Sequence, residues 1–353
     1  MKNAIASGIS GRFCVPLLLG ATFMFLNPSR GSAQIVVPNP PNGLIGFWSG
    51  NGTAADTSPT GNNGSFGGSY VPGCPGGGGA AFNLATSYVY IPNNAVYDQF
   101  QYYTGWTVGF WFNANGTAAP YFFLGQDNGS GYQPKWFIDY GYTVYSSNND
   151  FVWHVNDYNE ERIFLASQPV SPFPSGWNQL TVVTNNSGGS VGFYLNGAPI
   201  STVGLPSYVL ETTAQLIFGE MEGLTYNGLM CDVAIYNRAL SSQEVVELVN
   251  SGAQVGITAS GLAYSRVTKT FDGTVTIINQ SGNAISGPFE ILFPSLAAGV
   301  TLANASGTYY TTPYVTVDGS LATGQSATVS VRFSDPSNAT IRATPVVYSG
   351  SLN

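Results

Sequence analysis

Residues 191–200 read Val191-Gly192-Phe193-Tyr194-Leu195-Asn196-Gly197-Ala198-Pro199-Ile200, and this stretch decides the fold class. Two short runs of apolar and small residues are separated only by Asn196-Gly197. Asn-Gly favours the positive φ angles of a two-residue type I′ turn, which joins two antiparallel strands. The stretch therefore predicts a β-hairpin.

The same pattern of short strands and turns extends along most of the chain. Further Asn-Gly pairs begin at Asn51, Asn63, Asn115, Asn128 and Asn227. Alternating or apolar runs predict strands at 44–48, 80–91, 105–113, 120–125, 135–140, 150–155, 162–166, 178–184, 214–219 and 229–236. Many short strands with frequent turn signals predict an all-β protein built as a two-sheet antiparallel jelly roll or sandwich.

One short helix is expected after the last of these strands. Ser241 and Glu244 have the spacing of a capping box, with Ser241 as N-cap and Glu244 three residues later. Val245, Leu248 and Val249 share one helical face, and Gly252 supplies a stop.

Charge divides the chain near residue 254. The 353 residues carry only 10 Lys and Arg, too few for nucleic-acid binding through a basic surface. Residues 34–253 hold three bases and fourteen acids, whereas residues 254–353 hold four of each. All six Trp lie between Trp48 and Trp177. We therefore predict one domain at 43–252 and a second, smaller β-sandwich at 254–353, with 34–42 as a linker.

Residues 1–33 have the layout of a signal peptide. Lys2 and Arg12 precede an apolar run from Val15 to Leu26, and the small residues of Gly31-Ser32-Ala33 follow. The run is short for a membrane anchor, and no later segment is apolar enough to span a membrane. The sequence thus predicts a secreted protein, extracellular or at the cell surface.

Two cysteines remain after residue 33, at Cys74 and Cys231. Export to an oxidising compartment favours a disulfide between them, and two buried free thiols are the alternative.

Several motifs of the first domain occur in the order typical of one family. The chain opens with Gly43-Leu44-Ile45-Gly46-Phe47-Trp48 and closes with Asn227-Gly228-Leu229-Met230-Cys231-Asp232-Val233-Ala234-Ile235-Tyr236-Asn237-Arg238-Ala239-Leu240-Ser241. Residues 43–252 resemble the laminin-G-like, concanavalin A-like lectin jelly rolls of bacterial exported proteins. The resemblance implies two antiparallel sheets with loops at one rim. The chain departs from the family where paired acids are replaced by Cys231-Asp232, and where the hairpin turn carries Asn196 instead of Asp.

The second domain resembles an exported immunoglobulin- or fibronectin-like module. Thr274-Val275-Thr276-Ile277-Ile278-Asn279 and Leu321-Ala322-Thr323-Gly324-Gln325-Ser326 carry this resemblance. It implies a spacer or stacking role without catalysis.

Enzymatic activity is not expected. Glu220 with Glu222, and Asp157 with Glu160 and Glu161, lack the spacing of the glucanase carboxylates, so both groups are interpreted as solvated acids. The single histidine, His154, lies within a predicted strand and is interpreted as structural.

Calcium is the expected ion. It binds carboxylate, amide and carbonyl oxygens, which the loop from Asp56 to Gly64 supplies. The family resemblance implies a site formed by Asp56, Asn63 and Asp232. The alternative is an Asx turn at Asp56 and a backbone partner for Asp232.

Carbohydrate binding is the expected function. Residues 121–158 contain twelve aromatic residues, and an aromatic ring offers an apolar face to a sugar. We expect Trp136, Tyr140, Tyr142 and Trp153 to contact a polysaccharide or cell-surface glycan, unless these rings only fill the core. The alternatives are a structural surface or matrix protein without a small ligand, and a weak glycosidase or lyase.

Overall fold

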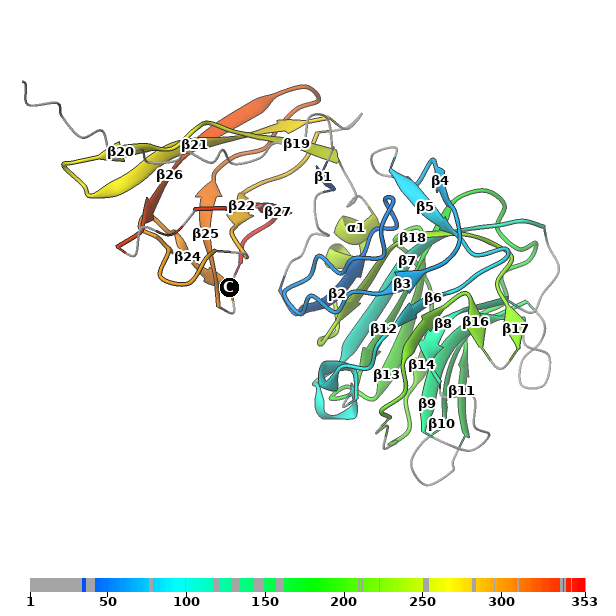
Figure 1. Cartoon of the computed structure of the whole chain (residues 1–353). Helices are drawn as coiled ribbons and strands as arrows, with labels where there is room; N and C mark the ends of the chain where they lie inside the picture. The colour runs from blue at the N-terminus through cyan, green and yellow to red at the C-terminus, as the bar shows by residue number, and fades with distance from the viewer. Residues whose placement is uncertain are drawn as a thin grey trace, which may run out of the picture.

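The computed structural model describes residues 34–35, 42–75, 79–98, 100–116, 121–127, 134–141, 149–156, 162–208, 210, 212–221, 223–249, 254–280, 284–294, 296–309, 311–336, 339, 341–343 and 345–352. These residues form two β-sandwiches, a larger one and a smaller one (Figure 1). The all-β prediction is therefore confirmed.

Two antiparallel sheets face each other in the larger sandwich. The seven-stranded sheet has the order β11 (Arg162–Ala166), β10 (Phe151–Asn156), β9 (Lys135–Tyr140), β8 (Tyr121–Gln126), β15 (Leu216–Phe218), β6 (Val89–Ile91) and β3 (Ser65–Phe66). A two-stranded hairpin, β16 (Glu220–Met221) and β17 (Leu224–Thr225), follows β15.

The eight-stranded sheet has the order β14 (Ala198–Gly204), β13 (Ser190–Leu195), β12 (Asn178–Asn185), β7 (Trp106–Ala114), β18 (Gly228–Tyr236), β5 (Ala80–Asn83) and β4 (Tyr70–Pro72), with β2 (Leu44–Trp48) paired to β18. Two short 3-10 helices, η1 (Ala95–Tyr97) and η2 (Phe100–Tyr102), precede β7.

Large aromatic side chains fill the space between the two sheets. Trp106 stacks on Phe100 with ring centroids 4.4 Å apart, and its edge contacts Trp136 and Trp153. These four side chains are fully buried. Burial of such large apolar areas is the main stabilising contribution in this sandwich.

The predicted hairpin is confirmed at β13 and β14. Asn196 and Gly197 have φ angles of 52° and 80°, as a type I′ turn requires. The single strand predicted at 80–91 is wrong, because turn residues 84–86 separate β5 from β6. The two halves belong to different sheets.

The predicted capping box is also confirmed. Helix α1 (Ser242–Val249) begins after Ser241, whose Oγ accepts a hydrogen bond from the Glu244 amide at 3.3 Å. The Glu244 carboxylate in turn accepts a bond from the Ser241 amide and pairs with Arg238 at 2.7 Å. The predicted stop, Gly252, lies outside the described residues. None of the helices in the described part has the length and hydropathy of a membrane-spanning segment.

The smaller sandwich recruits a strand from the N-terminal side of the larger one. Its six-stranded sheet contains β1 (Gln34–Ile35), β19 (Gln254–Ala259), β21 (Thr270–Asn279), β26 (Ser326–Ser334), β23 (Thr301–Leu302) and β20 (Ala263–Ser265). Its four-stranded sheet contains β24 (Gly307–Tyr309), β25 (Thr312–Val317), β22 (Phe289–Leu292) and β27 (Val346–Ser349). Because β1 pairs with β19, the interpretation of 34–42 as a plain linker is wrong for residues 34–35.

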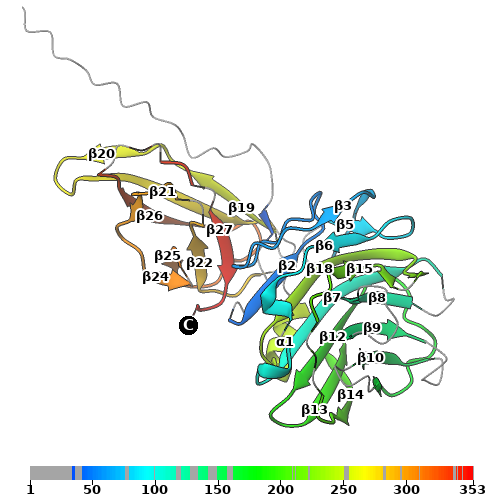
Figure 2. The ribbon, with the colours of Figure 1, turned by 60° about the horizontal axis from the view of Figure 1, so that its bottom comes forward.

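An apolar cluster joins the two sandwiches. Phe47 and Leu248 of the larger sandwich share it with Tyr348 and Leu352 of the smaller one. The Tyr348 hydroxyl also donates a hydrogen bond to the Thr57 carbonyl at 3.1 Å. Figure 2 shows β27, which carries Tyr348, on the side of the smaller sandwich near β2.

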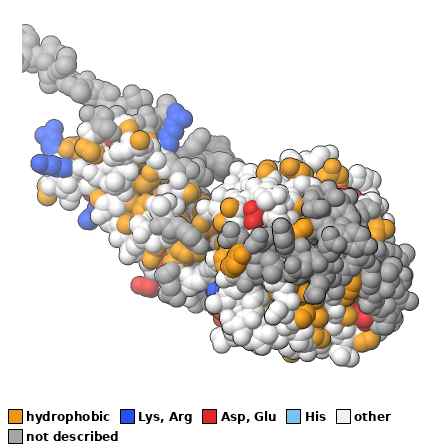
Figure 3. Space-filling model, turned by 90° about the horizontal axis from the view of Figure 1, so that it is seen from below, with side chains coloured by type: hydrophobic (Ala, Val, Ile, Leu, Met, Phe, Trp, Pro, Cys, Tyr) orange, Lys and Arg blue, Asp and Glu red, His pale blue; other side chains and the backbone are white. Residues whose placement is uncertain are grey.

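The charge division is visible on the surface. The blue Lys and Arg side chains in Figure 3 lie mostly on the smaller sandwich, where Arg266, Lys269 and Arg332 are exposed.

Candidate functional site

The loop after β2 is organised around the carboxylate of Asp56. Its Oδ1 accepts hydrogen bonds from the amides of Phe47 (2.9 Å) and Ser58 (2.8 Å). Its Oδ2 accepts from the Thr60 hydroxyl (2.7 Å) and the Asn62 amide (2.8 Å). The bond to the amide two residues on makes an Asx turn, the alternative considered for this residue.

Asn63 also has a structural role in this loop, because its Oδ1 accepts a hydrogen bond from the Asp56 amide at 2.9 Å. Both oxygens of Asp56 are thus engaged by protein donors. Among the described residues, the one group of at least three acidic, Cys or His ligand atoms close enough to hold an ion contains Cys74, Cys231 and Asp232, and not Asp56. The Asp56 and Asn63 oxygens therefore already accept hydrogen bonds from the protein, and calcium binding at Asp56, Asn63 and Asp232 stays a prediction.

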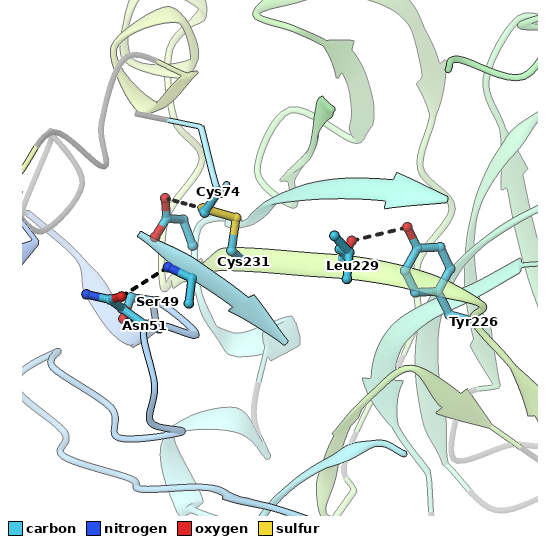
Figure 4. The surroundings of a disulfide bond; sticks show 8 residues. Ser49, Asn51, Cys74, Tyr226, Leu229 and Cys231 are labelled. Atoms are coloured by element: carbon cyan, nitrogen blue, oxygen red, sulfur yellow. Dashed lines mark hydrogen bonds between the residues drawn. A yellow bond between two sulfur atoms is a disulfide. The ribbon is translucent and has the colours of Figure 1, made fainter. Parts of the chain in front are cut away.

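Cys74 and Cys231 form a disulfide, as predicted, with their Cα atoms 6.2 Å apart. Figure 4 shows Cys231 within β18 and Cys74 on the neighbouring segment. Cys74 lies between β4 and β5, so the bond ties this hairpin to the closing strand across 157 positions of sequence. In the chain-entropy description, a loop of this length contributes roughly 3–5 kcal/mol to stability.

Asp232 lies next to this disulfide at a β-bulge. The register of β18 against β7 shifts between Cys231 and Ala234, and Asp232 has a φ of 48°, rare for a residue other than glycine. A regular strand would point Met230 and Val233 to opposite faces, but with the bulge between them both belong to the same core.

The carboxyl of Asp232 is 5% exposed. Its amide donates to the Ser49 carbonyl at 3.3 Å, and its Oδ2 lies 3.4 Å from the Cys74 Sγ. Its Oδ1 has no hydrogen-bond partner among the described residues. Burial raises the pKa of this carboxyl to about 8. A disulfide sulfur carries no proton, so the contact to Sγ is a hydrogen bond only when the carboxyl itself is protonated and donates.

The aromatic residues predicted to bind glycan are core residues where the structure describes them. Trp136 and Trp153 are 0% exposed and Tyr140 is 2% exposed. The Trp136 indole donates to Gln126, and the Tyr140 hydroxyl donates to the Val170 carbonyl. The prediction of a binding platform is wrong for these three, because their ring faces pack inside the sandwich. Tyr142 lies outside the described residues.

The opposite face of the same strands, which we call the outer face of the seven-stranded sheet, carries a different set of side chains. One row of directly paired residues crosses all seven strands: Phe164, His154, Phe137, Gly125, Ile217, Tyr90 and Ser65. The imidazole of His154 packs between the rings of Phe137 and Phe164, each 4.0 Å away. His154 also makes a 2.8 Å hydrogen bond with Asn156, which agrees with a structural histidine.

The same outer face contains a buried ion pair that the sequence did not indicate. The Lys135 Nζ lies 3.8 Å from the Asp127 carboxylate, and both side chains are 3% exposed. Asp139, next along β9, is 1% exposed. Alternation along β9 was the available signal, since Lys135, Phe137 and Asp139 point away from the side that Trp136 and Ile138 occupy.

At the β6 edge of this face two tyrosines are exposed. Tyr88 and Tyr90 are 47% and 41% exposed, whereas Val89 between them is fully buried. Tyr90 is paired with Ser65 of β3 on one side and with Ile217 of β15 on the other. Figure 2 shows β3 and β6 side by side at this edge. The sequence reading missed this pair because the density of aromatic residues is higher at 121–158.

Comparison with known proteins supports the fold of the larger sandwich. A family model described as concanavalin A-like lectin/glucanases superfamily matches residues 83–246. No curated protein matches the chain.

Solved structures resemble the chain at low identity. Domain 4 of AbnA, an extracellular arabinanase from Geobacillus stearothermophilus solved with arabinotriose, is 18% identical with a TM-score of 0.46, covering 58% of this chain and 98% of that one. The binding domain of botulinum neurotoxin serotype D is 13% identical with a TM-score of 0.46, covering 88% of this chain and 98% of that one. Scores at this level say nothing about what this chain binds. The matched residues 83–246 lie within the larger sandwich, and its two facing antiparallel sheets agree with the jelly-roll fold of that family model.

Proposed function

We propose that this protein is an exported, non-catalytic glycan-binding or adhesion protein, and that Tyr88 and Tyr90 form its binding platform. The observation that carries the proposal is the exposure of these two rings. The other large aromatics that fill this sandwich, including Trp48, Trp106, Trp136 and Trp153, are fully buried.

The two rings are placed as a sugar-binding surface requires. Residues two apart on an extended strand project to the same side, about 7 Å from each other. A tyrosine ring offers an apolar face to sugar C–H groups, and its hydroxyl offers a hydrogen bond. The exposed Ser65 of β3, paired with Tyr90, extends the surface with a polar neighbour.

The arrangement of acids favours binding over hydrolysis. A retaining glycosidase needs two carboxyl groups about 5–5.5 Å apart on either side of the scissile bond. In the described part of the chain, Asp127 is engaged with Lys135, and Asp56 accepts four hydrogen bonds. Neither is arranged as half of such a pair.

Affinity electrophoresis through gels that contain soluble polysaccharides tests the proposal. A glycan that retards the wild-type chain should retard the Tyr88→Ala/Tyr90→Ala variant much less. Tyr102→Ala is the matched control, because Tyr102 is 65% exposed but lies in η2, outside the seven-stranded sheet. Equal retardation of all three proteins would show that Tyr88 and Tyr90 do not bind the glycan. No retardation across a broad polysaccharide panel would favour a structural matrix protein, and release of reducing ends would show a glycosidase.

A further inference from the structure

We propose that Cys74, Cys231 and Asp232 form a binding site for a thiophilic divalent cation such as Zn²⁺ when the disulfide is reduced. The site is separate from the tyrosine platform and does not depend on the proposed function. In the oxidised protein the two sulfurs are bonded to each other and offer no thiolate.

The three ligand atoms are already gathered. The two Sγ atoms and a carboxylate oxygen of Asp232 lie within 4.8 Å of one another, and all three residues are buried. Tetrahedral zinc with Zn–S bonds of about 2.3 Å and Zn–O bonds of about 2.0 Å places its ligand atoms roughly 3.5–3.8 Å apart. The 3.4 Å between the Cys74 Sγ and the Asp232 Oδ2 is close to that spacing. Two thiolates, one carboxylate and a water would complete a four-coordinate site.

Asp232 is otherwise unexplained. A buried carboxyl oxygen without a partner is costly, and so is a non-glycine residue at positive φ. Asp232 combines both: its Oδ1 has no partner among the described residues, and its φ is 48°. The described basic side chains of this sandwich are engaged elsewhere, Lys135 with Asp127 and Arg238 with Glu244. After reduction of the disulfide, a cation bound to the two thiolates would supply this missing partner.

The local backbone permits the change from disulfide to metal site. The sulfurs must move apart by somewhat less than 2 Å to reach the spacing of two zinc ligands. Cys74 sits in the turn between β4 and β5, next to Gly73, which has a φ of 112° and open space around it. Cys231, in contrast, is held in β18, where it is paired with Trp111 of β7. We therefore expect the Cys74 segment, and not β18, to move when the two sulfurs separate.

The chemistry balances with a reductant from outside the chain. A dithiol or phosphine reductant supplies two electrons, the S–S bond breaks, and each sulfur takes up one proton. The cation then displaces both thiol protons, so binding releases protons to the solvent. Thiolates favour Zn²⁺ over the hard cations Ca²⁺ and Mg²⁺, which prefer oxygen ligands.

Cobalt substitution of the full chain provides the test. Co²⁺ is added to protein that is reduced with a phosphine, and thiolate-to-cobalt charge-transfer absorption is recorded, followed by displacement with Zn²⁺ against a chromophoric chelator. We expect one metal per reduced chain and none at this site in the oxidised chain. Asp232→Asn should weaken zinc binding by at least roughly tenfold, because removing even an outer-shell partner typically costs that much. Glu290→Gln, which removes a buried acid of the smaller sandwich, should leave binding unchanged.

Three results would overturn the proposal. The first is the absence of charge-transfer bands in reduced protein that retains its β-sheet circular dichroism. The second is equal binding by oxidised and reduced protein, which would place the metal elsewhere. The third is an unchanged zinc affinity in Asp232→Asn, which would show that this carboxylate is not a metal ligand. The comparison of oxidised and reduced wild-type protein needs no variant, so it stands even if Asp232→Asn fails to fold.

Discussion

Asp56 and Asp232 are both buried aspartates, 6% and 5% exposed, but their carboxyl groups differ in hydrogen bonding. Asp56 accepts four hydrogen bonds from three amides and a hydroxyl. Asp232 has no charge partner, and burial raises its pKa to about 8. The sequence analysis predicted both as calcium ligands. The sequence could not distinguish the two residues, because the difference arises in the folded chain. The loop after β2 supplies hydrogen-bond donors to Asp56, whereas the β-bulge in β18 buries Asp232 without a charged partner in the described part of the chain.

The raised pKa of Asp232 predicts a pH-dependent stability in the oxidised, metal-free protein. An unfolded chain releases this proton near pH 3.8, whereas the folded chain holds it until about pH 8. The free energy of unfolding should therefore fall as pH rises from about 4 to 8, by on the order of 5 kcal/mol. Asp232→Asn should lack this fall. Urea unfolding at pH 5 and pH 8 measures it, and identical pH slopes for the two proteins would contradict the assignment.

The hydrogen bonds of Asp56 predict a large structural effect of its removal. Asp56→Ala leaves the amides of Phe47, Ser58 and Asn62 without their side-chain acceptor, so the free energy of unfolding should drop by about 2–4 kcal/mol. Asp318→Ala, which removes an exposed acid, should change it by less than about 0.5 kcal/mol.

The same arrangement predicts that a chelator does not lower the melting temperature of the wild-type protein. Calorimetry of calcium-saturated protein, with and without chelator, measures this. A clear drop on chelation would restore the calcium prediction and contradict the view that hydrogen bonds alone satisfy this loop.

At the scale of elements, local patterns predicted most strands and the helix. The Asn196-Gly197 turn and the Ser241 capping box depend only on residues near each other in sequence, and both are confirmed. Burial was harder to predict, because β9 is buried on both faces. Alternation separates Trp136 from Phe137 but does not reveal which side faces solvent. The sequence analysis therefore favoured the aromatic-rich segment 121–158 and did not select the exposed Tyr88 and Tyr90.

The hairpin between β13 and β14 gives a prediction at this scale. Gly197 has a φ of 80°, and an added Cβ would lie 3.3 Å from a Val249 methyl. Gly197→Ala should lower the free energy of unfolding by about 1–2 kcal/mol, through strain at positive φ. Gly204→Ala at the end of β14 is the control, since that position has open space and no positive φ. Chemical denaturation compares them, and equal effects would argue against strain at the turn.

The two sandwiches contact each other, although the change in net charge near residue 254 suggests two independent domains. Apolar residues of both sandwiches form one cluster, and β1 adds a strand from residues 34–35 to the smaller sandwich. Composition predicted a boundary near 254, but it could not predict this contact, because the contact joins residues about 300 positions apart.

A fragment of residues 34–249 tests this contact. It should fold, because its own core is complete, but it should melt at a lower temperature than the full chain and bind a hydrophobic dye at the uncovered Phe47 and Leu248. Scanning calorimetry and dye fluorescence measure both effects. A fragment as stable as the full chain, with no dye binding, would show that the sandwiches are energetically independent.

The central claim, that glycan binds at Tyr88 and Tyr90, is tested most directly by chemical footprinting. Exposed tyrosines are nitrated in the absence and presence of a polysaccharide that retards the protein, and peptide mass spectrometry reports each site. Without ligand, Tyr88, Tyr90, Tyr102 and Tyr264 should all react, since each is at least 41% exposed. With ligand, Tyr88 and Tyr90 should be protected while Tyr102 and Tyr264 react as before. Unchanged nitration of Tyr88 and Tyr90 under saturating polysaccharide would contradict the account.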